Sequence, residues 1–518
     1  MLFRSGAVTL LLVILGMICV SQVMTKNECE KYKVGPQTQN AIERIKQACA
    51  TDGSAHFRDS CGLDDLLFTW NQAKDLQAKV APTGNIARKK RKVMDFEAFD
   101  ISESERWSPD APVLFDFEGS FTDEQKANIR DGIELFSRDT CFVFEETTDG
   151  DEAELRFVED DSSLTYMGRV KADDLPHEVF LNAEGASRPG EVVHYLGHAF
   201  GFWHEQQQPG RDNFVNILTD NIIEGEESNY MVFEEYVNTH GLPYDYGSIM
   251  HYSANSFSKN GEPTMEPVCA EELKQWHSKT MGQRSEMTFY DRKQIHQTYC
   301  TDVCDDDLEC QNGGFQNSKD CGVCVCPDGF GGTTCEVLGV YNSEADCGGQ
   351  LTVSDDPQFI SSPGYQAGQP YDVHTTCSWG LSIPQGSAER KKRETSRIKL
   401  KFTGEQFGVY SRNGVFYHWV EIRTGEDLTQ PGVRFGGDDI PTLELTSETN
   451  QTLVIFKSNY DADDVVATSR SGFQVSYEID SDDDDDTTSA CAEEPCENGG
   501  TCENQDAGFV CRCTEDYE

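Results

Sequence analysis

The stretch His194-Tyr195-Leu196-Gly197-His198-Ala199-Phe200-Gly201-Phe202-Trp203-His204 decides the fold of the central part of this chain. His194 and His198 are four residues apart, so one helix carries both imidazoles on the same face. Gly201 permits a turn that other residues resist, and the turn brings His204 back to the same point. Three neutral imidazoles about 2.0–2.1 Å from one ion form a catalytic-type zinc site with an open position. The spacing therefore predicts one zinc ion per subunit rather than three unrelated surface histidines.

The residues on either side of this stretch predict one globular domain over residues 92–301. Apolar spacing predicts helices over residues 123–136 and 191–202. Short runs of apolar residues predict strands at residues 141–144 and 179–181. At 518 residues the whole chain is too long for a single core, so we expect further domains beyond this one.

The histidine spacing is similar to the metzincin signature H-E-x-x-H-x-x-G-x-x-H. Its extension Gly201-Phe202-Trp203-His204-Glu205-Gln206, followed by Arg211-Asp212 and by Ser248-Ile249-Met250-His251-Tyr252, resembles the astacin family of zinc metalloendopeptidases. Further matches to that family are Arg106-Trp107, Cys141, Tyr244-Asp245-Tyr246 and Gly282-Gln283-Arg284. The resemblance covers about residues 92–301.

The resemblance implies an α+β metzincin domain with an open cleft and zinc at the cleft floor. It implies that Met250 lies beneath the zinc in a Met-turn. Tyr252 would be a switchable further ligand or a stabiliser of the oxyanion, and Glu205 would pair with the newly cut N-terminus.

Tyr195 departs from this pattern, because the family has glutamate there. That carboxylate takes a proton from zinc-bound water and later gives it to the leaving amine. A phenol has a pKa of about 10, so it is protonated at neutral pH and is a poor base. Losing a positioned general base costs about 10²–10⁴-fold in rate. Glu191 lies one helical turn earlier, and we expect it to be too far up the helix to replace the missing group.

Two functions follow from these residues. The first is a metalloendopeptidase that hydrolyses peptide bonds with zinc-bound water, as the family does. The second is an inactive zinc-binding pseudoprotease that acts as an extracellular protein-binding module. Tyr195 favours the second, and the intact ligands favour the first. A structural role in a matrix is a third hypothesis.

The N-terminus predicts secretion. Arg4 precedes an apolar run over residues 7–20, and small and polar residues follow it. This order indicates a signal peptide over residues 1–24 rather than a membrane anchor, since a bilayer span needs about 20 apolar residues. Arg88-Lys89-Lys90-Arg91 then predicts convertase cleavage after a propeptide of residues 25–91. An exposed basic loop is the alternative.

The latency mechanism stays open at this point. Astacin propeptides usually block zinc with an aspartate in an F-x-G-D sequence. Asp59, in Phe57-Arg58-Asp59, lacks the glycine, and Asp100 follows the basic cluster. Neither fits that sequence.

Two kinds of module follow the central domain. Six cysteines over residues 304–336 form an EGF-like framework, which disulfides must hold because so short a segment buries little core. Residues 347–479 contain alternating strand patterns and resemble a CUB domain, an all-β sandwich. Residues 480–490 form an acidic linker, and residues 491–518 begin a partial EGF-like module that lacks its sixth cysteine. We expect the native protein to continue beyond it.

The resemblances also imply disulfides, a glycan and a second metal. The implied disulfides are Cys141–Cys300, Cys304–Cys321, Cys310–Cys324, Cys326–Cys335 and Cys347–Cys377. Four further cysteines have no assigned partner: Cys29, Cys49, Cys61 and Cys269. A bond from the propeptide to Cys269, a free thiol and a bond to a partner chain are equal alternatives. Asn450 is the expected glycan acceptor. CUB domains often bind calcium, and Glu421 and Asp372 are acidic residues in suitable segments. A second tetrabasic run at residues 390–393 predicts a surface loop rather than a cleavage site.

The net charge of −48 excludes simple electrostatic binding to nucleic acid or anionic lipid, because both are polyanions. No segment after the signal peptide is long and apolar enough to span a membrane. We therefore expect a secreted protein whose partners are protein or peptide substrates, or extracellular protein ligands.

Overall fold

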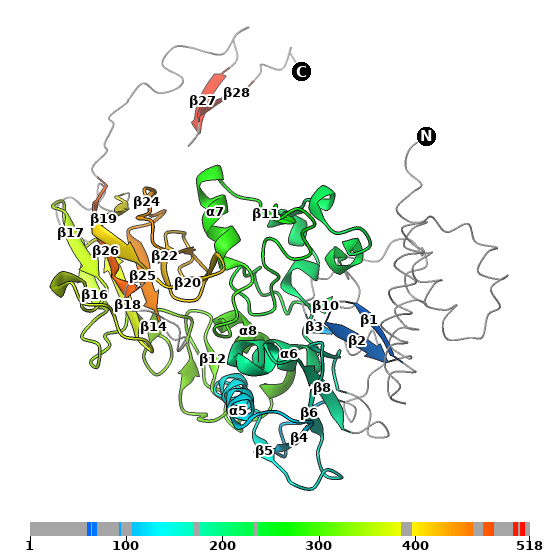
Figure 1. Ribbon diagram of the computed structural model, residues 1–518. Coiled ribbons are helices and arrows are strands. Elements are labelled where there is room, and N and C mark those ends of the chain that lie inside the picture. The colour runs from blue at the N-terminus through cyan, green and yellow to red at the C-terminus, as the bar shows by residue number, and fades with distance from the viewer. Residues whose placement is uncertain are drawn as a thin grey trace.

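The computed structural model describes residues 60–63, 65–69, 93–94, 106–169, 176–232, 237–384, 396–458, 470–480, 501–505 and 508–512. Three parts of the chain are named below by their residues. They are the central domain (residues 106–300), the cysteine-rich module (residues 304–336) and the β-sandwich (residues 347–480) (Figure 1). The predicted signal peptide, the basic cluster at residues 88–91 and the acidic linker lie outside the described residues.

One half of the central domain is a sheet that β1 and β2, from the segment before the domain, extend to seven strands in the order β1-β2-β7-β8-β6-β4-β5. Its strands are β1 (Ser60–Leu63), β2 (Leu66–Thr69), β4 (Val113–Glu118), β5 (Phe144–Glu146), β6 (Leu155–Glu159), β7 (Leu164–Tyr166) and β8 (His177–Leu181). β4, β5, β6 and β8 run parallel to one another, and β7 is antiparallel to β8. β2 adds in parallel beside β7, pairing Leu66 with Thr165. A segment from before the basic cluster therefore extends the sheet.

Two helices pack against this sheet. α5 (Asp123–Ser137) begins with a capping box, in which Thr122 and Gln125 satisfy each other's backbone amides. Its buried face meets α6 (Pro189–Ala199), and both helices join one apolar core with the strands. The centre of that core is a group of packed aromatic rings around Phe200, including Trp107, Phe136 and Phe142.

The other half of the central domain is mostly irregular. Its helices are α7 (Glu271–Thr280) and α8 (Phe289–Ile295), followed by a π-helical turn, His296–Cys300. Its short strands are β3 (Val93–Met94), β9 (Val215–Ile217), β10 (Val237–Asn238) and β11 (Met265–Pro267), with 3-10 turns at Gly185–Ser187, Glu205–Gln207, Arg211–Asn213, Thr219–Asn221 and Glu227–Tyr230. The disulfide between Cys141 and Cys300 joins the end of the domain to the segment after α5.

Two predicted elements differ from the structure. The strand expected at residues 141–144 begins only at Phe144, because Cys141 is tied into the disulfide and Phe142 enters the aromatic core. The helix expected over residues 191–202 begins earlier, at Pro189, whose missing amide costs nothing in a first turn. It ends at Ala199, because Gly201 takes a positive φ of 90°.

The cysteine-rich module is held by Cys304–Cys321, Cys310–Cys324 and Cys326–Cys335. Its strands are β12 (Phe315–Gln316), β13 (Cys324–Val325), β14 (Phe330–Gly331) and β15 (Val337–Leu338), paired as two small antiparallel sheets. Near the C-terminal end, β27 (Thr501–Gln505) and β28 (Gly508–Arg512) form an antiparallel pair.

The β-sandwich consists of a five-stranded sheet, β16-β18-β25-β22-β23, and a four-stranded sheet, β17-β26-β19-β24. The strands are β16 (Gly349–Thr352), β17 (Gln358–Ser361), β18 (Thr376–Ser382), β19 (Ile398–Gly408), β22 (Trp419–Arg423), β23 (Val433–Phe435), β24 (Glu444–Thr446), β25 (Gln451–Lys457) and β26 (Gly472–Ile479), with a separate hairpin of β20 (Ser411–Arg412) and β21 (Val415–Phe416) and a 3-10 turn at Tyr365–Ala367. A disulfide joins Cys347 to Cys377, and the apolar faces of both sheets form a second core.

Glu421 on β22 is a buried carboxylate held by two arginines. Arg423 Nε donates to it at 2.6 Å and Arg434 Nε at 3.0 Å. Burial alone would raise the pKa of Glu421, but these arginines and the Gly432 amide lower it to about 2. Both carboxylate oxygens of Glu421 therefore accept hydrogen bonds from arginines in this structure.

Lowering the pH should reduce the stability of the β-sandwich, because Glu421 becomes protonated. Its folded-state pKa lies below the ordinary value of 4.5, so the carboxylate stabilises the fold above about pH 4.5. This contribution, on the order of 3 kcal/mol, is lost as the pH falls from about 4.5 towards 2. We expect the Glu421→Gln variant to have a lower free energy of unfolding than the natural chain at neutral pH. We also expect this free energy to fall less in the variant when the pH is lowered. Urea unfolding followed by tryptophan fluorescence checks this, and an unchanged pH slope in the variant would contradict it.

Candidate metal centre

The end of α6 brings the three predicted histidines together. The Phe202 amide donates to the Gly197 carbonyl and the Gly201 amide to the His198 carbonyl, both at 2.9 Å. These two bonds around a left-handed glycine form a Schellman motif, which closes the helix and reverses the chain. His194 and His198 therefore stay on one helical face while His204 returns to meet them.

The second nitrogen of each imidazole is held by an oxygen. His194 Nδ1 donates to the Ile249 carbonyl at 2.9 Å, and His198 Nδ1 donates to the Phe202 carbonyl at 2.7 Å. His204 Nδ1 lies 3.1 Å from Gln207 Oε1. Because these oxygens accept, each Nδ1 carries the proton and each Nε2 presents a lone pair. Such partners fix the ring orientation of metal-binding histidines.

The three Nε2 atoms fit a metal ion. His194 Nε2 and His198 Nε2 lie only 3.2 Å apart, yet both are lone-pair atoms in this tautomeric arrangement. His204 Nε2 is buried without a hydrogen-bond partner. Lone pairs that face one another in a dry site repel unless a cation lies between them. Burial, then Arg284 and His198, lowers the pKa of His194 well below its usual value, so the neutral form that binds metal is favoured.

Asp65 completes the group, and sequence reasoning missed it. Its Oδ2 lies 2.9 Å from His194 Nε2 and 3.4 Å from His198 Nε2, and its Oδ1 lies 3.2 Å from His204 Nε2. The Asp65 Oδ1 atom is buried without a hydrogen-bond partner, which is expected of a metal ligand when no ion is bound. Within the described residues, these four side chains are the group close enough to hold a metal ion. Three imidazoles and one carboxylate match the donor set and number of a closed zinc site.

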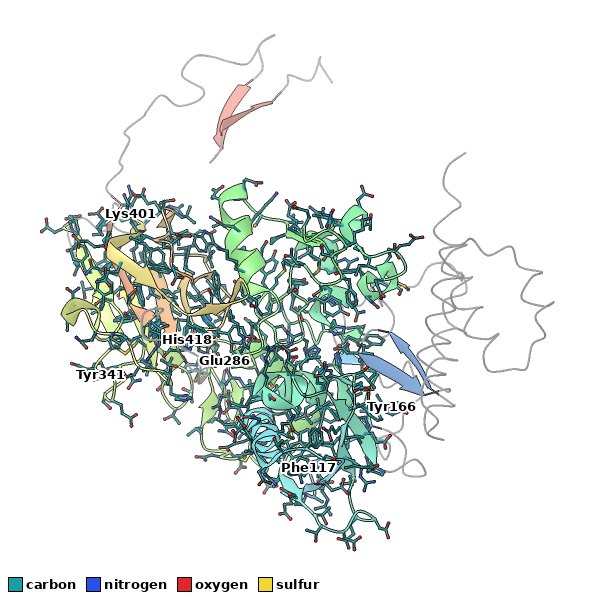
Figure 2. All side chains as sticks on the ribbon, viewed as in Figure 1. Phe117, Tyr166, Glu286, Tyr341, Lys401 and His418 are labelled. Atoms are coloured by element: carbon teal, nitrogen blue, oxygen red, sulfur yellow. A yellow bond between two sulfur atoms is a disulfide. The ribbon has the colours of Figure 1, made fainter. Side chains whose placement is uncertain are left out.

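The backbone explains how Asp65 reaches the histidines. The Asp65 carbonyl accepts the Thr165 amide at 3.0 Å, and Leu66 then continues as β2 beside β7. Figure 2 shows this strand beside the labelled Tyr166. Asp65 does not occur in an F-x-G-D sequence, which is why the motif did not find it. The available signal was an acidic pair, Asp64-Asp65, between two short apolar runs upstream of the basic cluster. The earlier candidates, Asp59 and Asp100, lie outside the described residues.

Tyr195 lies next to the metal centre but belongs to the apolar core. Its ring meets the His194 ring edge to face, with centroids 5.4 Å apart, and the residue is 8% exposed. Glu191, the nearest acidic residue on the helix, lies 3.6 Å from Arg188 and 3.5 Å from Arg284. Its charge is therefore directed towards those guanidiniums rather than towards the histidines.

The residues predicted to form the Met-turn pack against α6 and against His204. Met250 is buried, and a Cβ added at Gly197 would meet its Sδ at 2.5 Å, so helix and turn are in close contact. The Tyr252 ring lies 4.4 Å from the His204 ring, centroid to centroid. Glu205 is buried, and its Oε1 accepts the Asp245 amide and Gln208 Nε2, both at 2.7 Å. Glu205 thus joins the histidine segment to the chain leading into the Met-turn.

Gly190 gives a test of how closely α6 is packed. A Cβ at this position would lie 1.8 Å from the Arg284 carbonyl oxygen, a backbone atom with no freedom to rotate away. We expect Gly190→Ala to lower the free energy of unfolding by about 1–3 kcal/mol, as overpacking does. Thermal unfolding measures it. Gly425→Ala is the matched control, because nothing lies within 4 Å of its added Cβ. Equal stability of the two variants would contradict the packing argument.

The remaining predicted residues that the structure describes do not belong to the four-residue group at the metal centre. Asn450 is partly exposed, and its carbonyl accepts the Ile383 amide. Asp372 accepts a hydrogen bond from Ser458 Oγ through its carbonyl oxygen, at 2.8 Å. Cys269 is a free, partly buried thiol, and burial raises its pKa. Side chains of Cys29, Cys49 and Cys61, and the basic run at residues 390–393, lie outside what the structure describes.

Comparison with known proteins defines the class. Residues 100–300 match the family model of the astacin peptidases, and residues 347–477 match the CUB domain model. A zinc metalloproteinase, dpy-31, from Haemonchus contortus is 32% identical over 402 residues, which are 76% of this chain and 68% of that protein. The chain therefore belongs to the astacin family and carries a CUB domain.

Other relatives agree in class. The dpy-31 zinc metalloproteinase of Teladorsagia circumcincta is also 32% identical over 402 residues, or 76% of this chain and 61% of its own length. The chain thus spans about 61–68% of these two relatives. A solved hatching enzyme, high choriolytic enzyme 1 from Oryzias latipes, is 28% identical and covers 38% of this chain and 96% of its own, with a TM-score of 0.33.

Proposed function

We propose that this chain is an extracellular astacin-family protein that binds one zinc ion but hydrolyses peptide bonds slowly or not at all. The observation that carries the proposal is Tyr195, which stands where the family has its general base and packs into the core. Glu191 faces arginines, and Glu205 accepts two hydrogen bonds within the fold. Neither carboxylate is placed to take a proton at the metal centre.

The residues of the site have separate roles in this proposal. His194, His198 and His204 would hold the ion, and their Nδ1 partners orient each ring so that its Nε2 faces the other two. Bound zinc lowers the pKa of its water towards about 7 and polarises a carbonyl. Asp65 would serve as a fourth ligand while the N-terminal segment is attached, and it would then exclude water and substrate from that position. Tyr195 offers a phenol, which stays protonated at neutral pH and accepts no proton from water.

Asp65 also supports a latent state. By family resemblance an aspartate of the propeptide blocks the zinc, and the Asp65 contacts supply such a group. We propose cleavage after the basic cluster at residues 88–91 as the step that allows this segment to leave.

A second candidate is a slow metalloendopeptidase. The full set of three histidines and the buried Met250 favour it, because zinc alone activates its water in part. Tyr252, next to His204, would stabilise the oxyanion. Peptide or protein substrates would enter beside β7, at the sheet edge that β2 occupies.

Extracellular protein binding is proposed for the remaining modules. Five disulfides occur among the described residues, which is typical of oxidising compartments. Within the described part of the chain, no helix is long and apolar enough to cross a membrane. The cysteine-rich module is proposed to be EGF-like, and together with the CUB domain it offers surfaces for protein ligands. The net charge of −48 argues against nucleic acid as a ligand.

Peptide hydrolysis by the zinc-loaded, propeptide-free protein tests the proposal against its alternative. We expect the natural chain to cleave a broad peptide library far more slowly than its Tyr195→Glu variant. Comparable rates would favour the metalloendopeptidase and would mean that another group is the base.

A further inference from the structure

The contact between the central domain and the β-sandwich contains a cluster of buried charges. Lys457, at the end of β25, donates from Nζ to Glu286 Oε1 at 2.5 Å and lies 3.0 Å from Asp328 Oδ2 of the cysteine-rich module. Arg292 of α8 lies 3.8 Å from Asp328 Oδ1. Glu286 and Lys457 are both buried. Figure 2 labels Glu286 between the ribbons of the two domains. Charges from three parts of the chain thus meet here, and Arg292 also pairs with Asp139 of the central domain at 2.7 Å.

An aromatic contact accompanies these charges. Trp276 belongs to α7 of the central domain, yet its ring packs on Phe435 and Phe416 of the β-sandwich, with centroids 4.9 and 6.3 Å apart. It is 6% exposed and joins the apolar core of the β-sandwich. Tyr290 Oη of α8 donates to the Thr429 carbonyl at 3.0 Å. A side chain of the central domain therefore forms part of the β-sandwich core. Domains joined only by a flexible linker do not share a core in this way.

A third contact reaches the chain that leads into the Met-turn. A Cβ added at Gly247 would lie 2.3 Å from Arg434 Nη1, so the guanidinium lies directly against this glycine. Arg434 is held there by Glu421 and by the face of Trp419, with its Cζ 4.2 Å from the ring centroid. Gly247 immediately precedes Ser248-Ile249-Met250.

Hydrogen bonds connect the charge cluster to a histidine of the metal centre. Glu286, paired with Lys457 through its side chain, accepts Gln283 Nε2 at its carbonyl, and the same Nε2 donates to the Gly247 carbonyl, both at 2.7 Å. Two residues further on, the Ile249 carbonyl accepts His194 Nδ1. The path from the β-sandwich to a zinc ligand thus runs through one side-chain amide and a short segment of the turn.

A neighbouring bond holds the same turn from α8. Asp291 accepts the Ser248 hydroxyl at 2.6 Å and the Ile249 amide at 3.0 Å. Arg292 is the next residue of α8 and faces Asp328. The segment that positions His194 is therefore held on two sides, by Gln283, which also bonds Glu286, and by Asp291, which precedes Arg292 in α8.

We propose that the β-sandwich and the cysteine-rich module buttress the Met-turn through this charge cluster, and that their docking sets how long the three-histidine site retains its metal ion. The inference rests on the zinc binding proposed above and adds a structural role for the modules in keeping the ion. A buried charge pair discriminates against misplaced partners, because any other docking leaves a charge unpaired. The cluster thus fixes one position of the β-sandwich against the turn.

Zinc release from the full-length, zinc-loaded chain into excess chelator tests the proposal. Lys457→Met and Glu286→Gln each break the cluster from one side, and we expect each to speed release by at least about 10-fold, the size of effect found for residues that orient metal ligands. Lys399→Met is the matched control, because Lys399 pairs at 3.0 Å with Glu444, another residue of the β-sandwich. We expect its release rate to stay within about 2-fold of the natural chain.

Hydrogen exchange separates this result from loss of folding. We expect faster amide exchange over residues 244–252 in both cluster variants, with protection in β22 and β25 kept. Release rates equal to the control, or faster exchange confined to the β-sandwich, would overturn the proposal. A natural chain that binds no zinc at equilibrium would instead refute the zinc function itself, so the two failures are distinguishable.

Discussion

Tyr195→Glu should raise peptide hydrolysis by roughly 10²–10⁴-fold, which is the contribution of a positioned general base. The substitution places a carboxylate on the residue that follows His194, where the astacin resemblance puts the general base. The histidines keep their Nδ1 partners, all of which are backbone carbonyls or Gln207, and none involves residue 195. Tyr195 is 8% exposed, so replacing its ring also removes part of the core, and some loss of stability accompanies the gain.

The measurement is kcat/KM on a peptide library with zinc-loaded protein cleaved after the basic cluster. Tyr195→Gln is the matched control, because glutamine has the size of glutamate and removes the same ring without supplying a base. We expect it to remain as slow as the natural chain. A glutamine variant as fast as the glutamate variant would mean that relief of packing, not proton transfer, limits the rate. A natural chain as fast as Tyr195→Glu would contradict the pseudoprotease proposal.

Asp65→Ala should open the fourth position of the metal centre in the uncleaved chain. The carboxylate lies within 3.4 Å of all three histidine Nε2 atoms, and no other described acidic residue joins the group. Without it, we expect zinc to leave for a chelator roughly 10–100-fold faster, since loss of an orienting or ligating group weakens metal sites by at least that factor. We also expect a small hydroxamate to bind the open position, as it does not in a closed four-ligand site.

Asp64→Ala serves as the control, because it removes the adjacent negative charge in the sequence and leaves Asp65. Zinc release and hydroxamate binding in this variant should match the natural chain. If Asp65→Ala released zinc no faster and bound no hydroxamate, Asp65 would not be a ligand, and the propeptide would block the site by covering it.

Sequence patterns predicted the metal centre in most respects. The His194, His198 and His204 spacing follows from helix periodicity and one left-handed glycine, both of which are local. The structure adds the Nδ1 partners Ile249 and Phe202, which are backbone carbonyls and leave no mark in a sequence. Asp65 reaches the site only because β2 pairs with β7, a strand that lies far from it in the chain. No short motif encodes that pairing here.

The disulfide-rich and β-rich modules were also predictable as classes. Cysteine spacing and strand alternation indicated their folds, because small modules need covalent support and sandwich strands alternate in burial. Glu421 shows the limit of this reasoning, since its acidic side chain in a suitable strand did not allow a calcium site to be assigned from the sequence. The fold instead brings Arg423 and Arg434 against its carboxylate. Whether a buried acidic group binds a metal ion or pairs with an arginine depends on which residues the neighbouring strands place beside it. The sequence alone does not show which strands are neighbours.

The sequence by itself determined the class of the protein, its three candidate histidine ligands and the presence of Tyr195 beside the first of them, because each depends on residue type and spacing within one helix and one turn. Tertiary structure alone decided three contacts. Asp65 lies against those histidines, arginines pair with the buried Glu421 carboxylate, and Lys457 pairs with Glu286. The contacts of His194 with Asp65, Arg434 with Glu421 and Lys457 with Glu286 join residues 13 to 171 positions apart, and they form because buried charges are tolerated only where folding supplies a compensating partner.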